Sequence, residues 1–92
     1  MKLNLSISVE SDVETGKILA AYIKVRDGKS AKTREYVPGA VFADFDRKGQ
    51  LLGIEMLGPV KIAVLQRIAQ KESEPTQRFV RSVVPHELVA AS

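Results

Sequence analysis

The sequence contains no cysteine. This absence excludes disulfide bonds and thiolate-bound metals, and it fits a reducing compartment. Long apolar runs are also missing, because no uncharged stretch approaches the roughly 20 residues that a membrane-spanning helix needs. The first residues, MKLNLSISVESD, alternate apolar with polar side chains and therefore do not have the continuous apolar run of a signal peptide. We expect a cytoplasmic protein without a membrane segment.

The composition that is present predicts one small folded domain. The chain has 92 residues, of which 45% are hydrophobic and 27% are charged, as is ordinary for a globular protein. A chain of this length has room for one hydrophobic core, so residues 1–92 are expected to form a single domain. Domains near this size often use spare apolar surface to bind a partner.

Residues 1–57 have the pattern of an antiparallel sheet. Residues 3–9 alternate strictly between apolar and polar side chains, which is typical of a half-buried strand. Further strands are expected at 18–26, 30–37, 41–46 and 50–57. Short turns separate the segments, at SDVETG, Asp27-Gly28, Pro38-Gly39 and Lys48-Gly49. Strands joined in this way predict a β-meander of four to five strands.

The strand register depends on the lengths of the turns, because the apolar faces must stay aligned. A three-residue turn at 27–29 would pair the second predicted strand with the third. A three-residue turn at 38–40 would pair the third with the fourth, whereas a two-residue turn at Pro38-Gly39 would shift that pairing by one residue. The expected cross-strand pairs are Ile23–Thr33, Val37–Val41 and Thr33–Phe45 on the core face, and Arg34–Asp44 and Lys32–Asp46 on the polar face.

Residues 58–72 are predicted to form a helix that covers one face of the sheet. Gly58-Pro59 ends the strands, and the apolar residues of 60–71 fall within about half of a helical wheel. Residues 73–92 form a helical or irregular tail, in which Pro85 would end any second helix. The fold class is therefore α+β. The expected core residues are Leu19, Ile23, Val25, Val41, Ala43, Phe45, Leu52, Ile54, Met56, Val64, Leu65 and Ile68.

Three carboxylates, Asp44, Asp46 and Glu55, are expected on the polar face of the sheet. Clustered carboxylate oxygens suit hard cations, and Gly53 opposite Asp44 would leave open space for an ion or ligand. The bases that this register pairs with the two aspartates would compete for the same oxygens. We interpret the three carboxylates as a structural face, with a metal site or a small-molecule enzyme as an alternative.

Basic residues gather in one segment of the chain. The expected basic face consists of Lys24, Arg26, Lys32 and Arg34. Together with nearby tyrosines, such a face could bind nucleic acid, so a nucleic-acid-binding or antitoxin-like partner protein is a second alternative. The net charge of +3 is small, however, and neighbouring acids would neutralise the face. Lysines on a strand also prevent edge-to-edge aggregation.

Apolar side chains are also expected among the charges of the polar face, namely Tyr22, Tyr36, Phe42, Leu51 and Leu57. An exposed apolar row often marks an interface, so we expect a homodimer, or docking of the C-terminal segment on this face. His86 has no second metal-ligating partner, and we expect it at a helix start or on the surface. The glycines match neither a dinucleotide-binding motif nor a P-loop. With no catalytic residue, metal or cofactor predicted, the expected function is a non-enzymatic, self-associating interaction module that could also bind another protein.

Two stretches of the predicted sheet carry a family resemblance. AAYIKVRDG (20–28), followed by Ala31-Lys32-Thr33, and VFADFDRKGQLLGIEML (41–57) resemble an ALYI strand, a turn and a VD-D--G-LVGIEIL hairpin. This pattern is similar to that of a small bacterial domain family of unknown function, number 2283 among such families, over residues 12–57. The most specific matches are Gly49, Gly53, Ile54 and Glu55. Residues 12–19 depart from the family's acidic, alanine-rich opening, and 75–92 fall outside its pattern. The resemblance implies an antiparallel sheet with a helix, and no particular activity.

Overall fold

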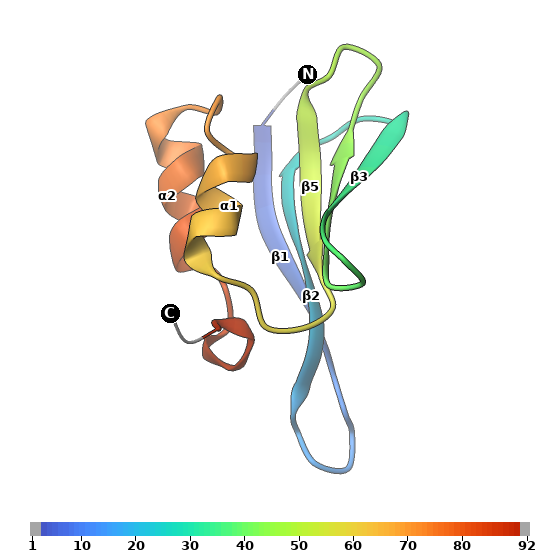
Figure 1. Ribbon diagram of the computed structural model, residues 1–92, viewed down its shortest axis with the longest axis vertical. Coiled ribbons are helices and arrows are strands. Elements are labelled where there is room, and N and C mark those ends of the chain that lie inside the picture. Colours follow the sequence, from blue (N-terminus) through green and yellow to red (C-terminus); the bar gives the residue numbers. More distant parts are fainter. Residues whose placement is uncertain (1–2, 91–92) are drawn as a thin grey trace.

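Five alternating segments form one antiparallel sheet in the computed structural model, which describes residues 3–90. The strands are β1 (Leu3–Ser11), β2 (Ile18–Arg26), β3 (Lys32–Val37), β4 (Val41–Phe45) and β5 (Leu51–Met56). They are followed by α1 (Ile62–Ile68), α2 (Glu74–Ser82) and the short 3-10 helix η1 (His86–Leu88). Both helices lie on one side of the sheet, and the β1–β2 hairpin projects beyond the other elements (Figure 1). The predicted α+β class is confirmed; residues 1–2 and 91–92 of the predicted domain lie outside the described residues.

The order of the strands differs from a simple meander. The strand order is β1-β2-β5-β4-β3, so β2 pairs with β5 and not with β3. Ile23 lies opposite Ile54, and the predicted Ile23–Thr33 pair is wrong. Residues 27–31 do not close a hairpin but carry the chain to the far edge of the sheet, so the predicted three-residue turn at 27–29 is wrong. This order places the apolar β2 between two strands and leaves the charged β3 at an edge.

A β-bulge changes the predicted register between β3 and β4. Val37 lies opposite Val41 as expected, but the register shifts between Glu35 and Val37. Tyr36 is the extra residue, and its side chain packs against the core. Thr33 consequently lies opposite Asp44. The predicted pairs Thr33–Phe45, Arg34–Asp44 and Lys32–Asp46 are therefore wrong.

A second register shift decides which leucine of β5 enters the core. Phe45 pairs with Leu51, whereas Asp44 pairs with Gly53. Leu51 belongs to the core cluster, but Leu52, although also buried, does not belong to it. Leu52 instead lines a hollow with Asp44 on the opposite face. The predicted places of these two leucines are therefore exchanged.

A third shift, between Glu10 and Ser11, accounts for the exposure of Leu19. Ala20 pairs with Glu10 and Ile18 pairs with Ser11, which leaves Leu19 without an opposite residue. Ile18 packs against the core, whereas Leu19 is 48% exposed. The prediction that Leu19 belongs to the core is wrong.

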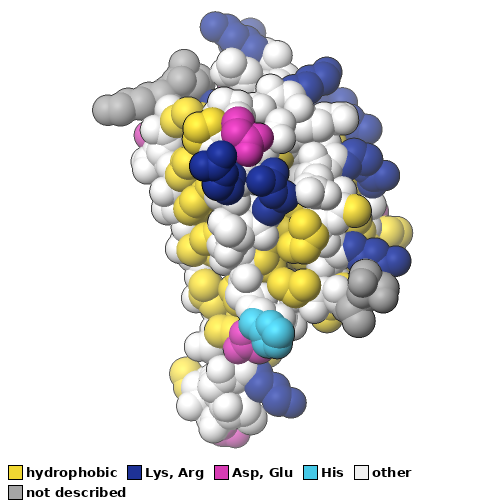
Figure 2. Space-filling view, turned by 90° about the vertical axis from the view of Figure 1, so that its left-hand side faces the viewer, with side chains coloured by type: hydrophobic (Ala, Val, Ile, Leu, Met, Phe, Trp, Pro, Cys, Tyr) yellow, Lys and Arg dark blue, Asp and Glu magenta, His cyan; other side chains and the backbone are white. Residues whose placement is uncertain are grey.

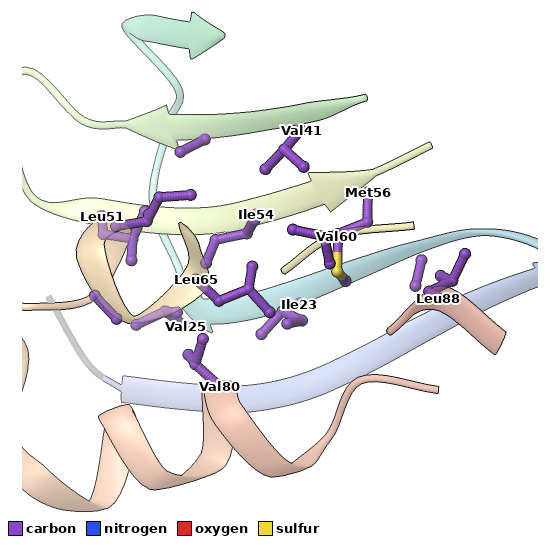
Figure 3. Packing of buried hydrophobic residues seen from close by; sticks show 14 residues of the cluster. Ile23, Val25, Val41, Leu51, Ile54, Met56, Val60, Leu65, Val80 and Leu88 are labelled. Carbon is purple, nitrogen blue, oxygen red and sulfur yellow. The ribbon is translucent and has the colours of Figure 1, made fainter. Parts of the chain in front are cut away.

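The core fills the space between the sheet and the helices. Figure 3 shows Leu65 of α1 close to Ile54 and Ile23, with Val80 approaching from α2. The remaining predicted core residues are confirmed in the cluster or packed against it: Val25, Val41, Ala43, Phe45, Met56, Val64 and Ile68. Val80 and Leu88 of the tail were not predicted to be buried, and both are part of this core.

Hydrogen bonds connect the tail to the segment before α1. The backbone N–H of Val60 donates to the Leu88 oxygen at 2.8 Å, and the Ala90 N–H donates to the Val60 oxygen at 2.9 Å. Because Val60 forms this bridge, it lies outside the helix, and α1 is shorter than the predicted segment 58–72. Within residues 3–90, no helix combines the length and apolar character that crossing a membrane requires.

Candidate functional site

The sheet face without helices, called the bare face below, carries a row of interacting side chains that crosses four strands. The Tyr22 hydroxyl on β2 donates to Asp44 Oδ2 on β4 at 3.0 Å. The Thr33 hydroxyl on β3 donates to Asp44 Oδ1 at 2.6 Å. Between them, the Tyr22 ring lies over Gly53 of β5, where a Cβ atom would come within 2.1 Å of the Tyr22 oxygen. The predicted open space beside Gly53 is therefore filled by this ring.

The electrostatics of this row keep the Tyr22 phenol protonated. Burial raises the pKa of Tyr22 well above its ordinary value of 10.0, and the hydrogen bond to Asp44 and the charges of Asp44 and Glu55 raise it further. A protonated phenol can donate to the carboxylate at every ordinary pH. Both oxygens of Asp44 thus accept hydroxyl hydrogen bonds, in place of the predicted arginine.

Asp46 stabilises the turn between β4 and β5. Its Oδ1 atom accepts the backbone N–H groups of Lys48 and Gln50, each at 2.9 Å. Gly49 closes the turn with a φ of 82°, a backbone conformation that favours glycine. Asp46 is only 6% exposed, and within the described chain its Oδ2 atom is buried without a hydrogen-bond partner. The geometry explains Asp46 as a turn residue.

The three predicted carboxylates do not converge. Asp44 lies in the row on the bare face, Asp46 holds its turn, and Glu55 is exposed opposite Tyr22. Among the residues that the structure describes, no three His, Cys, Asp or Glu side chains are placed to hold a metal ion. His86 is the exposed first residue of η1, a place that fits its prediction as a helix-start or surface residue.

The predicted apolar row is divided between the two faces of the sheet. Tyr22 and Leu57 line a hollow of about 250 Å³ on the bare face, where Phe42 lies opposite Glu55. Leu51 is buried in the core, and Tyr36 packs against it from the helix side. The register shifts at Tyr36 and Leu52 cause this division, since one extra residue in a strand reverses the side on which its neighbours lie.

Two residues of the predicted basic face are occupied by ion pairs. Lys24 pairs with Asp27, which is three residues further along the chain. Arg26 makes two hydrogen bonds to Glu72, at 2.7 and 3.3 Å, and also donates to the Leu51 carbonyl. The side chains of Arg26 and Glu72 are only 11% and 12% exposed, so this pair joins the sheet to the link between α1 and α2.

The other two predicted bases line a pocket on the helix side of the sheet. The pocket has a volume of about 620 Å³ and lies between β3, the turn after β4 and the end of α1. Five basic side chains line it: Lys32, Arg34, Arg47, Arg67 and Lys71. We call this site the basic pocket. Its last three members were not predicted, because they come from separate elements that only the fold brings together.

The comparisons with known proteins concern the central part of the chain. Residues 20–58 match the model of a family described as a protein of unknown function, DUF2283. This match confirms the resemblance inferred from the sequence. No curated protein and no solved structure matches the chain. The matched segment runs from within β2 to just past β5 and includes Tyr22, Thr33, Asp44 and Gly53, so the whole row on the bare face lies inside it.

Proposed function

We propose that the protein is a non-enzymatic interaction module that self-associates by pairing the free edge of β1 with that of a second copy. The candidate acids Asp44 and Asp46 support a role other than catalysis, because both Asp44 oxygens and the Oδ1 atom of Asp46 accept hydrogen bonds within the sheet and its turn. The support for self-association comes from the two edges of the sheet, which differ in how well they are protected against pairing.

The β3 edge is short, charged and bulged. It has six residues, among them Lys32, Arg34 and Glu35, and the β-bulge at Tyr36 interrupts it. Proline follows directly at position 38. Charges, bulges and proline all hinder the addition of another strand to an edge.

The β1 edge lacks most of these features. It has nine residues with Glu10 as its only charged side chain, and within the described chain it pairs with β2 alone. Its register shifts lie near its two ends, and the stretch from Ser6 to Glu10 pairs with β2 regularly. A regular edge strand presents a row of unpaired backbone N–H and C=O groups, to which another strand can add. This difference between the edges is the observation that carries the proposal.

The side chains of β1 are compatible with a two-fold axis at Ser8. Antiparallel pairing about Ser8 sets Ile7 opposite Val9 of the second copy, and sets Ser6 opposite Glu10. Val9 is 48% exposed, so this pairing would cover apolar surface. No two like charges would face each other. Hydrophobic side chains are visible on the side of the molecule that carries the helices (Figure 2).

The absence of cysteine permits a position-specific test. Ser8→Cys would place two thiols opposite each other at the axis, where opposed Cα atoms of antiparallel strands lie about 4.5–5.5 Å apart, within the range of about 4.4–6.8 Å that a disulfide spans. Mild oxidation should then produce a covalent dimer in denaturing electrophoresis. Gln66→Cys, on the exposed side of α1, is the matched control and should remain a single chain.

Sedimentation measures self-association without a chemical modification. The wild-type chain should sediment as a dimer, and Ser8→Lys should shift it toward the monomer because two lysines would face each other. Gln66→Lys adds the same charge elsewhere and should remain dimeric. A wild-type chain that is monomeric at the highest attainable concentration would show that the proposal is wrong. A Ser8→Cys chain that crosslinks no faster than the control would exclude the β1 edge.

A further inference from the structure

The basic pocket combines an apolar floor with a cationic rim. Phe45, Leu51 and Ile68 contribute the apolar surface, and the five basic side chains come from β3, the β4–β5 turn and the end of α1. Its volume of about 620 Å³ falls within the usual range for small-molecule sites, about 300–1,000 Å³. The pocket lies at the β3 side of the sheet, whereas β1 forms the opposite edge.

The positive charge of the pocket is only partly offset by the chain. Two acidic residues, Asp46 and Glu72, line it with the five basic ones. Glu72 is already paired with Arg26, and one oxygen of Asp46 accepts two backbone N–H groups. Within residues 3–90, the ion pairs involve other basic residues, so none of the five rim cations is bound to a carboxylate. Cations gathered around a concave site attract anions and concentrate them there.

Tyr36 positions two of the rim cations. The Arg34 and Arg67 guanidinium groups lie 5.4 and 5.8 Å from the centre of the Tyr36 ring. Contacts at such distances are attractive cation–π interactions. Arg34 comes from β3 and Arg67 from α1, so the ring holds together two guanidinium groups that are distant in sequence. The planar guanidinium can donate two parallel hydrogen bonds to phosphate oxygens.

We propose that the basic pocket binds a ligand that carries linked phosphate groups. The phosphates would contact Arg34, Arg67 and the neighbouring lysines, and an attached apolar or aromatic group would lie against the floor. Two sources share this chemistry: a free nucleoside triphosphate and a single-stranded nucleic acid. This site is independent of self-association, since it uses different residues at the opposite edge of the sheet.

Binding can be measured by calorimetry with three probes: inorganic tripolyphosphate, ATP and a short single-stranded oligonucleotide. At low salt, at least one probe should bind, and its affinity should fall as the salt concentration rises. Comparison of the three affinities identifies the source of the phosphates. If none of the probes binds at low salt, the proposal is wrong.

Two double variants distinguish binding in the basic pocket from a general electrostatic attraction to the protein. Lys32→Gln combined with Lys71→Gln removes two rim cations, and we expect binding to weaken about tenfold or more, because charge-assisted hydrogen bonds are the strong ones. Lys17→Gln combined with Lys61→Gln removes the same charge from exposed positions outside the pocket, and should change the affinity less than about twofold. Equal losses in the two variants would mean diffuse electrostatic attraction and would overturn the proposal.

A second pair tests the arginines held by Tyr36. Arg34→Gln with Arg67→Gln should also abolish most binding, and both side chains are exposed, so the fold should persist. Circular dichroism and the thermal midpoint verify the fold of each variant. A correctly folded arginine variant that binds as tightly as wild type would contradict the assignment of these two residues.

Discussion

The two faces of the sheet are built on different physical interactions. On the covered face, Ile23, Ile54 and Met56 are fully buried beneath the helices. On the bare face, Tyr22 lies over Gly53 and donates a hydrogen bond to Asp44. Apolar burial is roughly proportional to area and has no preferred direction, whereas the bare face depends on one ring fitting one glycine.

This contrast shows how a small domain can protect one face of its sheet from solvent although no helix covers that face. Gly53 and Ile54 are adjacent in β5, so the Ile54 side chain points into the core while the Cα of Gly53 faces the Tyr22 ring on the bare face. Ile54 fills space between the sheet and α1, whereas Gly53 leaves room for a ring from the neighbouring strand. Tyr22 thereby shields the backbone of β5 without help from a helix. Substitutions at these two positions therefore test the two faces separately.

The largest loss of stability is expected from a substitution on the covered face. Ile54→Ala should lower the free energy of unfolding by about 2–5 kcal/mol, because the substitution removes buried methyl groups and leaves a cavity. Glu55→Ala, at the exposed neighbour, is the matched control and should change it by less than about 0.5 kcal/mol. Urea denaturation of both variants measures the difference. Similar losses in the two variants would contradict the contrast between the faces.

The covered face was predictable where the strands are regular. Alternation correctly placed Ile23, Val25 and Ile54 in the core, because strict period-two alternation assigns each residue to a face. It failed at Leu19 and Leu52, each beside a register shift. One extra residue reverses the faces, and no local feature of the sequence marked where it would be inserted.

The strand order and the candidate sites were less predictable, because both depend on contacts between distant segments. Asp27-Gly28 is typical of a hairpin, but the burial of β2 against β5 decides the pairing. The acids and bases of the sheet were expected to pair with each other; Asp44 instead accepts hydrogen bonds from Thr33 and Tyr22. Nothing in the local sequence around a threonine or a tyrosine indicates that its hydroxyl group will donate to a carboxylate on another strand.

An intermediate loss of stability is expected from a substitution on the bare face. Gly53→Ala places a methyl group within 2.1 Å of the Tyr22 oxygen, so the ring must move away. Its displacement breaks the hydrogen bond to Asp44 and exposes the surface beneath the ring. We expect the free energy of unfolding to fall by about 1–3 kcal/mol, as for other overpacked sites.

A double-mutant cycle assigns this loss to the ring. In a Tyr22→Ala background, Gly53→Ala has no ring to displace, and alanine is usually better tolerated than glycine inside a strand. The substitution should then be nearly neutral, which gives a coupling free energy close to the full loss in the wild type. Equal losses in both backgrounds would mean that the glycine is required for another reason.

The smallest effect is a dependence of stability on pH at the same tyrosine. The pKa of Tyr22 is raised in the folded state above its ordinary value of 10.0, chiefly by burial and then by Asp44. As the pH rises above 10.0, the unfolded chain loses the phenol proton while the folded chain retains it. The contribution of Tyr22 to stability is therefore fully present below this pH, and it is lost progressively as the pH rises toward the folded-state pKa.

Two variants measure this effect. Tyr22→Phe should show a weaker decline of unfolding free energy above pH 10.0 than the wild type, because it has no phenol to ionise at this position. The chain contains two tyrosines, so Tyr36→Phe leaves Tyr22 as the only source of tyrosinate absorbance. In folded Tyr36→Phe, the absorbance midpoint should lie above 10.0. A midpoint at the ordinary value would mean that the Tyr22 ring is solvated, and the bare face would then lack the shielding that distinguishes it from an ordinary exposed sheet.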